Sequence, residues 1–160
     1  MSKSLKRVRA AAETLALDIE IEETSGSTRT AAEAAAEHGC DVAQIAKSIL
    51  FHAPESDRIV LFLTSGAYRV DLTQAEALIG EPLAKADAAL IRERTGFAIG
   101  GVSPIGSSGP VVEFFDRRLL DFPVIYPAAG TPRHTFAIAP QRLAEVMDAQ
   151  IADFSVDSDS

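Results

Sequence analysis

Lys47 is the residue best placed for chemistry that needs a fixed positive charge, and it falls in the predicted strand 45–51. Side chains alternate along a strand, so Lys47 shares one face with Ile45, Ile49 and Phe51. A lysine among three apolar neighbours must either extend its ammonium to water or be held in a pocket by polar partners. The periodicity leaves both readings open. In a pocket, the ammonium would act as a point charge on an anionic or polarised substrate group.

A glycine-rich segment, residues 95–106, is the second candidate; it reads Thr-Gly-Phe-Ala-Ile-Gly-Gly-Val-Ser-Pro-Ile-Gly. It has neither the dinucleotide-binding Gly-x-Gly-x-x-Gly pattern nor the Gly-Lys-Ser/Thr of a P-loop. The pair Gly100-Gly101 lets the backbone approach a ligand closely and frees peptide N–H groups to donate hydrogen bonds. The same composition also suits a plain connector, stiffened by Ser103-Pro104.

The third candidate is residues 128–134, Ala-Ala-Gly-Thr-Pro-Arg-His, between two predicted strands. His134 could act as a base, although a single histidine at the start of a strand is more often structural. The chain has no Gly-x-Ser-x-Gly nucleophile elbow. Cys40 follows a glycine and has no basic neighbour close in sequence, so we expect an inert, packed thiol.

The composition excludes several classes of protein. Three histidines and one cysteine, without metal-ligand spacing, give no metal motif, and no cofactor is expected. A single cysteine cannot form an internal disulfide, which favours a reducing, cytoplasmic location. No apolar run reaches the ~18 residues of a membrane-spanning helix, so no membrane partner is expected. A 47% hydrophobic and 24% charged composition is typical of a globular domain.

The elements that must position these residues follow from the apolar periodicity. We predict helices over residues 4–17, 31–38, 72–79, 87–94 and 140–149. We predict strands over residues 18–23, 45–51, 58–64, 67–71, 111–115, 122–126, 134–138 and 151–156. A loop is expected at 25–27, a capping box at Thr30–Glu33, and a hairpin turn at Ser65-Gly66.

No linker or repeat divides the chain. The pattern therefore predicts one α+β domain over residues 1–156, with hairpin-rich, mostly antiparallel pairing. Residues 157–160 read as an acidic tail that is disordered.

Taken together, several segments resemble the YbaK/prolyl-tRNA-synthetase-associated domain family. They are residues 30–35, residues 44–49 around Lys47-Ser48, Ser65-Gly66 with residues 69–72, the whole 95–106 segment, and the late Gly130. Their order and spacing match the family over about residues 5 to 155. The resemblance implies a curved, mostly antiparallel mixed sheet, open-barrel-like, surrounded by helices.

The resemblance also implies an aminoacyl-tRNA deacylase, an editing hydrolase that acts on the acceptor end of mischarged tRNA. The expected substrate is tRNA for proline carrying a wrong small amino acid, with prolyl-tRNA synthetase as a possible partner. The family's lysine falls on Lys47 and its Gly-x-x-x-Pro motif on Gly100 to Pro104. The catalytic residues are then Lys47, Gly100 and Gly101, and the substrate-binding residues Val102, Ser103, Pro104, Gly130, Thr131, His134 and Thr135.

Neither the cysteinyl nor the alanyl specificity known in the family transfers to this chain. Cysteinyl-specific members carry a Gly-Gly-Lys-Arg-Gly-like stretch where this chain has residues 129–133, and alanyl-specific members differ at Ser48 and at Ile125-Tyr126-Pro127. We expect water, or the thiol of a cysteinyl substrate, to attack the ester without a protein nucleophile. A non-catalytic binding module for aminoacyl-tRNA 3′ ends or small aminoacyl compounds is the alternative.

The charge bears on the nucleic-acid partner. Fifteen basic and 23 acidic residues give a net charge of −8, which argues against a DNA-binding protein and for weak, local contact with tRNA. Candidate contact residues are Lys3/Lys6/Arg7/Arg9, Arg92/Arg94 and Arg117/Arg118. A solvated helix face is the simpler reading of the first group.

Overall fold

The computed structural model describes residues 2–24 and 30–158; the predicted loop at 25–27 and the last two residues of the predicted tail lie outside them. The helices are α1 (Lys3–Thr14), α2 (Ala31–His38), α3 (Leu72–Ile79), α4 (Ala88–Thr95) and α5 (Pro140–Met147), with short 3₁₀ turns η1 (Val42–Gln44) and η2 (Arg117–Asp121). The strands are β1 (Ile21–Glu23), β2 (Ile45–Ala53), β3 (Arg58–Ser65), β4 (Tyr68–Val70), β5 (Ala84–Lys85), β6 (Val112–Asp116), β7 (Tyr126–Pro127), β8 (His134–Phe136), β9 (Gln150–Ala152) and β10 (Ser155–Asp157).

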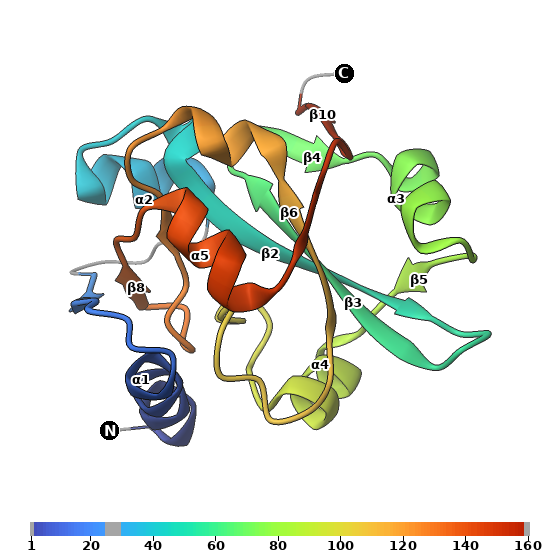
Figure 1. Cartoon of the computed structure of the whole chain (residues 1–160), viewed down its shortest axis with the longest axis horizontal. Coiled ribbons are helices and arrows are strands. Elements are labelled where there is room, and N and C mark those ends of the chain that lie inside the picture. The colour runs from blue at the N-terminus through green and yellow to red at the C-terminus, as the bar shows by residue number, and fades with distance from the viewer. Residues whose placement is uncertain (1, 25–29, 159–160) are drawn as a thin grey trace.

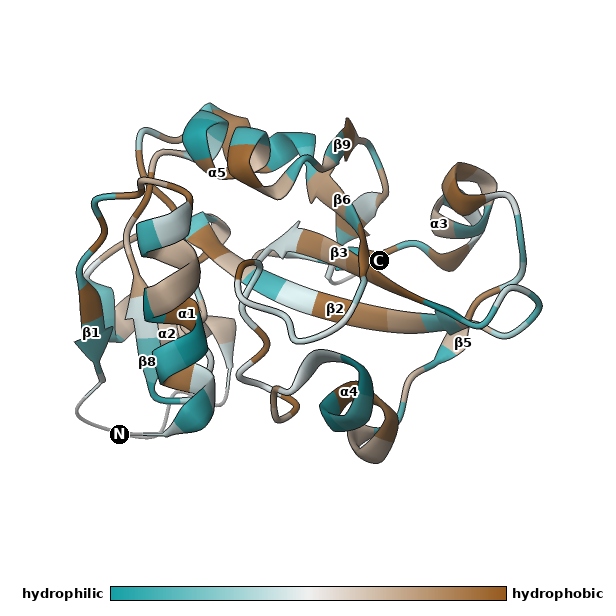
Figure 2. Cartoon of the chain, turned by 60° about the horizontal axis from the view of Figure 1, so that its bottom comes forward, coloured by the Kyte–Doolittle hydropathy of each residue, from teal (hydrophilic) through white to brown (hydrophobic). Residues whose placement is uncertain are grey.

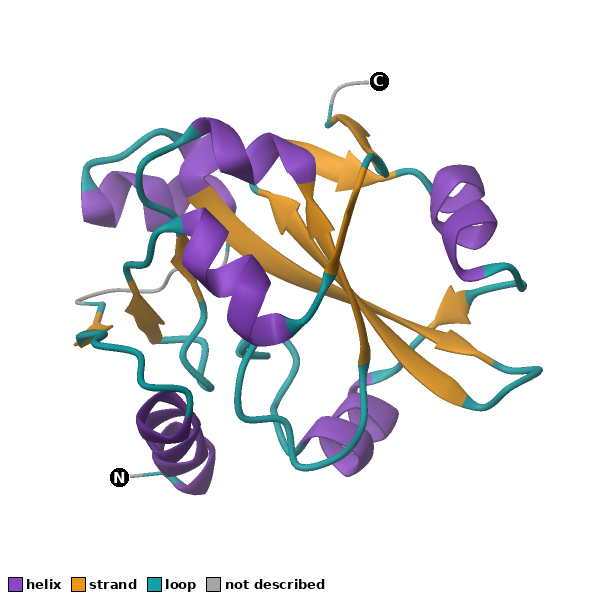
Figure 3. Ribbon diagram, in the orientation of Figure 1, coloured by secondary structure: helices purple, strands orange, loops and turns teal. Residues whose placement is uncertain are grey.

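A mixed sheet of order β5-β2-β3-β6-β9 forms the centre of the molecule, and β7 pairs with β2 beside it (Figure 1). The long β2–β3 ladder is antiparallel, from Ala46 opposite Ser65 to Ala53 opposite Arg58. Strand β6 joins β3 in parallel, and β9 joins β6 in parallel. Helices surround this sheet (Figure 3). The predicted α+β class with an open, mostly antiparallel arrangement is confirmed.

The core follows from the alternation along the central strands. Every residue of β3 after Arg58 is buried, because β3 is covered on both faces. One face packs Leu61 and Leu63 against α1, α4 and α5, and the other packs Val60 and Phe62 against α3. The apolar stretch of β3 runs through the middle of the molecule in Figure 2.

A second, smaller sheet lies at the α1 end of the molecule. Strands β1 and β8 pair antiparallel, with Glu22 opposite Thr135 and Glu23 opposite His134. Isolated bridges join Ile125 to Ile138 and Ala128 to Thr135. Residues 125–138 therefore form a hairpin that links β7, at the edge of β2, to β8. This hairpin carries all the late residues predicted for the site.

Several predicted strands are shorter than the pattern indicates. The predicted strand 122–126 begins only at Ile125, because Pro123 has no N–H to donate to a ladder. The predicted strand 18–23 is paired only over β1, where β8 offers partners. Helix α1 ends at Thr14 rather than residue 17, since Ala16 adopts a left-handed conformation with φ 54°.

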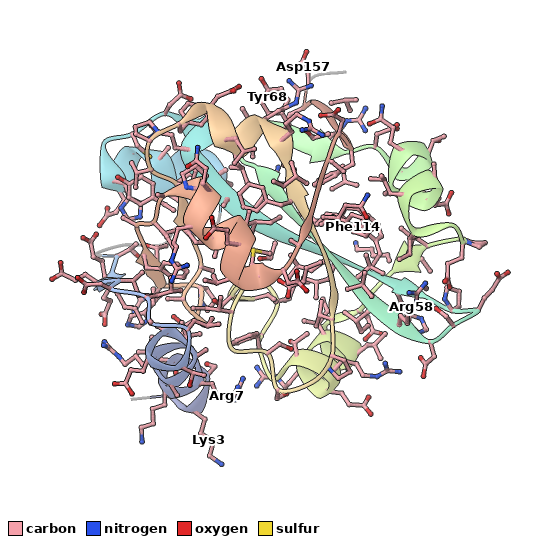
Figure 4. The ribbon with its side chains drawn as sticks, viewed as in Figure 1. Lys3, Arg7, Arg58, Tyr68, Phe114 and Asp157 are labelled. Carbon is pink, nitrogen blue, oxygen red and sulfur yellow. The ribbon has the colours of Figure 1, made fainter. Side chains whose placement is uncertain are left out.

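The prediction of one strand over residues 151–156 is wrong. Strand β9 joins the central sheet, Phe154 turns into the core with no exposed surface, and β10 pairs with β4. The predicted β3–β4 hairpin is also wrong. The chain does turn after Ser65, but β4 pairs with β10 from the other end of the chain. Figure 4 shows Tyr68 and Asp157, one pair of that ladder, close together.

The β4–β10 pair also carries the ladder one residue beyond the predicted domain boundary, since β10 includes Asp157. The hydroxyl of Ser158 donates to the carbonyl of Ala67. In residues 2–24 and 30–158, no helix has the length and apolar character needed to cross a membrane.

Candidate functional site

Lys47 lies in β2 directly opposite Thr64 of β3, which confirms the strand that was predicted around it. Its side chain is half-buried, between the apolar residues Ile45 and Ile49 of the same face. Burial lowers the pKa of the Lys47 ammonium, and the nearby carboxylate of Asp116 partly opposes that shift. The ammonium is therefore partly desolvated rather than fully solvated.

Asp116 supplies the negative charge on this face, and sequence reasoning missed it. The residue ends β6 with no exposed surface. One carboxylate oxygen accepts from the amide of Ser65 at 3.1 Å and the other from the amide of Arg118 at 3.1 Å. These bonds fix the position of the Asp116 carboxylate, whose charge acts on Lys47. The sequence does contain one sign of a structural role for Asp116: it directly follows an apolar strand, at the N-cap position of η2.

The hairpin 125–138 forms the wall beside Lys47. Tyr126 is paired with Ile45 in the parallel β2–β7 ladder, so its side chain lies on the face that carries Lys47. Thr135 lies opposite Ala128, two residues after Tyr126, and therefore shares this face. The structure thus brings Thr135 and Tyr126 to the Lys47 side of the sheet.

His38, at the end of α2, contacts two residues of the hairpin 125–138. Its ring stacks on Tyr126 with 4.4 Å between centroids, and its Nε2 is 2.9 Å from the hydroxyl of Thr135. Its Nδ1 lies 3.8 Å from the carboxylate of Glu22. No pattern in the sequence indicates this role for His38, because a histidine before a glycine is typical of a helix end.

The glycine-rich segment presents an exposed turn at Gly100, followed by buried residues from Gly101 to Ile105. Gly101 packs directly on the hairpin: a Cβ there would lie 2.6 Å from the carbonyl carbon of Thr131 and 2.8 Å from the nitrogen of Pro132. The predicted second and third candidates therefore meet in space. Only glycine allows this approach of two backbones.

The peptide hydrogens of this turn are only partly free. The N–H of Gly101 donates to the carbonyl of Ala98 at 3.0 Å, so this amide is not free to bind a ligand. Within the described residues, no partner is recorded for the N–H groups of Gly100 and Val102. These two amides remain as donors.

The side chains that follow face inward. Val102 and Ile105 belong to the main core, and Pro104 is buried. Ser103 is 2% exposed, and its hydroxyl accepts from the amide of Ile105 at 3.2 Å. A ligand at this loop would therefore meet backbone at Val102, Ser103 and Pro104 rather than their side chains.

Gly130, Thr131 and His134 form the tip and one side of the hairpin. Gly130 has φ 103° and packs on α1. The Thr131 hydroxyl is 2.6 Å from Nδ1 of His134, whose Nε2 is 3.2 Å from the carboxylate of Glu23. His134 precedes Thr135 in β8, so alternation directs it away from the Lys47 face. The predicted residues thus form two groups. One contains Lys47 and Thr135, and the other contains Gly101, Thr131 and His134; residues 128–131 of the hairpin connect them.

Other polar groups are buried near the glycine segment. Glu113 of β6 lines a cavity of about 250 Å³ with residues from Pro104 to Ser107, and its Oε2 is buried without a hydrogen-bond partner in the described chain. Burial raises the pKa of the Glu113 carboxyl to about 8. The hydroxyl of Ser48, on the sheet face opposite Lys47, is also buried without a partner in the described residues.

The raised pKa of Glu113 makes stability depend on pH. Between pH 4.5, which is the ordinary pKa of a glutamate, and about pH 8, the Glu113 carboxyl keeps its proton in the folded protein but loses it in the unfolded chain. Stability therefore falls as pH rises through this window and levels off above it. We expect Glu113→Gln to remove this slope and to be more stable than the wild type at pH 8 by a few kcal/mol, because each tenfold change in proton affinity is worth about 1.4 kcal/mol. Urea unfolding from pH 5 to 9 measures both curves, and parallel slopes would contradict the assignment.

Other side chains offer less chemistry. In the described part of the chain, no three His, Cys, Asp or Glu side chains are grouped to hold a metal ion. Burial, with Asp41 next to it, raises the pKa of the Cys40 thiol, which keeps it in its less reactive form.

Known proteins share both the sequence and the fold. A model of the aminoacyl-tRNA editing domain matches residues 25–146. The uncharacterized protein YwhH of Bacillus subtilis (strain 168) is 28% identical over 142 residues, which cover 89% of this chain and 90% of YwhH. The crystal structure of a protein named as a candidate trans-editing enzyme for prolyl tRNA synthetase is 43% identical and superimposes with a TM-score of 0.91, covering 98% and 99% of the two chains. The crystal structure of hypothetical protein APE2540 is 27% identical, with a TM-score of 0.87 over 94% and 99% of the chains.

Proposed function

This chain belongs to the family of aminoacyl-tRNA editing domains, and we propose that it hydrolyses the ester bond of mischarged aminoacyl-tRNA. The observation that carries the proposal is the half-buried ammonium of Lys47, which lies on the face that also carries Thr135 and within electrostatic reach of the buried carboxylate of Asp116. A desolvated cation beside a fixed anion is a common arrangement for binding a polar substrate group.

The proposed reaction needs few groups from the protein. A water oxygen adds to the ester carbonyl carbon, the bond to the ribose oxygen breaks, and that oxygen takes up a proton, which gives free amino acid and tRNA. Lys47 anchors the terminal ribose or phosphate, or polarises the carbonyl, as a point charge. The amides of Gly100 and Val102 are the donors for the developing oxyanion, each worth roughly 2.7–4 kcal/mol at comparable sites. No side chain is proposed as nucleophile, so intact-protein mass spectrometry during turnover should detect no acyl adduct.

We propose tRNA for proline carrying a wrong small amino acid as the substrate, and prolyl-tRNA synthetase as the partner that passes it on. The 43% identity to the protein named as a candidate trans-editing enzyme for that synthetase supports the link to prolyl-tRNA synthetase. Thr135 and Tyr126 would then contact the amino-acid part, because they lie on the Lys47 face.

The test is a panel of tRNAs for proline, each charged with a different labelled amino acid and incubated with the purified protein. Loss of acid-precipitable label from one or more mischarged tRNAs, with prolyl-tRNA spared, is expected. Tight binding without loss of label would overturn the hydrolase and favour the binding module.

Some of the basic residues predicted to contact tRNA already interact with other side chains of this chain. Arg94 pairs with Asp57, Arg117 pairs with Asp153, and the Arg118 guanidinium lies 4.0 Å from the centre of the Tyr68 ring. Lys3, Lys6 and Arg9 are exposed on α1, and among the described residues they form no ion pair with a carboxylate. We propose that this face of α1 contacts phosphates near the acceptor end.

Reversing two of these charges tests that surface. We expect Lys3→Glu combined with Lys6→Glu to raise KM for mischarged tRNA about tenfold at low salt, with kcat almost unchanged and a shallower dependence of KM on salt, because two phosphate contacts are lost. The comparison variant, Lys85→Glu with Arg92→Glu, reverses two exposed charges near β5 and α4. A rise in KM for this pair and none for the α1 pair would place the tRNA on the α4 side instead.

A further inference from the structure

Arg7 of α1 does not join the exposed basic residues of its helix. Its side chain is half-buried, and its guanidinium reaches the glycine-rich segment. Nη2 donates to the carbonyl of Gly96 at 2.6 Å, and Nε donates to the carbonyl of Gly106 at 3.2 Å. One side chain therefore binds both ends of an eleven-residue loop (residues 96–106). In Figure 4, Lys3 points away from the molecule, whereas Arg7 lies on the inner side of α1.

The surroundings of Arg7 are shaped for this contact. The guanidinium carbon lies 5.0 Å from the centre of the Phe97 ring, a cation–π arrangement with a fully buried aromatic residue. A Cβ at Gly96 would collide with the guanidinium, and one at Gly106 would lie 3.1 Å from the Arg7 carbonyl oxygen. Gly96 and Gly106 both have positive φ, of 79° and 86°. Glycine at both ends of the loop therefore allows the backbone carbonyls to approach Arg7.

Helix α1 also supports the hairpin. A Cβ at Gly130 would lie 2.9 Å from the carbonyl oxygen of Ser4 and 3.0 Å from Cγ2 of Val8. Gly101 in turn lies against Thr131. The helix, the loop and the hairpin therefore contact one another pairwise, and the exposed turn at Gly100 is held by that arrangement.

We propose that Arg7 is a positioning residue for the editing site: its guanidinium closes the 96–106 loop and so fixes the Gly100–Val102 backbone against the hairpin. Arginine suits this role because its planar fork can donate in two directions at once, which a lysine ammonium on a flexible stem does less well. The catalytic consequence rests on the proposed hydrolysis, whereas the loop-closing role does not.

Hydrogen exchange tests the loop-closing role without reference to activity. The variant is Arg7→Met, which keeps an apolar stem and loses both donors. We expect the hydrogen-bonded amides of Gly101, Ile105 and Ser108 to exchange at least about tenfold faster, with the amides of β2 and β3 unchanged. Equal exchange in the loop, or faster exchange through the whole domain, would overturn the proposal.

Kinetics test the consequence for editing. We expect kcat of Arg7→Met on mischarged tRNA to fall about tenfold or more, with KM within about twofold of the wild type. Millimolar guanidinium ion should restore part of kcat in Arg7→Met, and Arg7→Lys should be intermediate. Glu13→Ala, at an exposed position of the same helix, should match the wild type in kcat and in loop exchange. A change in KM alone, or no rescue, would contradict positioning.

The two arms separate the possible failures. If the wild type deacylates none of the mischarged tRNAs, the proposed function fails, and the exchange experiment still decides whether Arg7 closes the loop. If the wild type is active and Arg7→Met keeps full kcat, the positioning role fails while the hydrolase remains.

Discussion

Lys47→Ala is expected to lower the rate of deacylation of the best mischarged tRNA by about a hundredfold or more, which corresponds to about 2.7 kcal/mol of transition-state stabilisation. Lys47 supplies a half-buried ammonium that burial has partly desolvated and that interacts electrostatically with the carboxylate of Asp116. Alanine removes the positive charge that we propose binds the substrate, while the negative charge of the buried Asp116 carboxylate remains. Single-turnover assays with labelled tRNA measure the rate.

The fold should survive this substitution. The Asp116 carboxylate keeps its two bonds from the amides of Ser65 and Arg118, and the β2–β3 ladder needs no side chain at position 47. Circular dichroism and urea unfolding should show a stability within about 1 kcal/mol of the wild type. Lys85→Ala, at an exposed lysine of β5, is the matched control and should retain full activity. Full activity of Lys47→Ala on its best substrate would remove Lys47 from the site.

Gly101→Ala carries the second large expected effect. The added Cβ would lie 2.6–2.8 Å from backbone atoms of Thr131 and Pro132, a separation that real Cβ atoms do not tolerate. Because both neighbours are backbone, the loop and the hairpin must move apart, which displaces the Gly100 and Val102 amides. A shift of about 1 Å at a catalytic group can cost about a hundredfold in rate. We expect kcat to fall by that order while substrate still binds.

Gly80→Ala is the control variant, because it introduces backbone strain at a positive φ without displacing the loop or the hairpin. Gly80 lies at the far end of α3 with φ 81°, and a Cβ added there would have no other atom within 4 Å. Alanine there should cost about 1 kcal/mol of stability and leave kcat unchanged. If Gly101→Ala keeps the wild-type kcat, the 96–106 loop is a connector and its amides stabilise no oxyanion.

The sequence predicts best those parts of the fold that local patterns control. The alternation along residues 45–51 and 58–64 identifies β2 and β3, and with them the face that carries Lys47. The Thr30 cap is likewise a local signal, and its side chain accepts from the amide of Glu33 as expected. These features depend on residues a few positions apart.

What the sequence did not predict depends on distant partners. Nothing local separates β9 from β10, since their partners β6 and β4 are set by the whole topology. Asp116 lies near Lys47 only because β6 joins β3 in parallel. From the sequence, Arg7 looks like another basic residue of an exposed helix, and only the folded structure shows that it binds the 96–106 loop. The placement of His134 away from the Lys47 face also follows only once the hairpin is traced.

The bonds of Arg7 also have a consequence for synthesis on the ribosome. They join residues 89 and 99 positions apart in the chain. The first helix therefore emerges long before its partners and must wait for Gly106, and then for Gly130, to leave the exit tunnel. Contacts of such long range form late in folding. A nascent chain that ends before Gly106 lacks one of the two carbonyls that Arg7 binds, so the 96–106 loop cannot be closed by Arg7 in that chain.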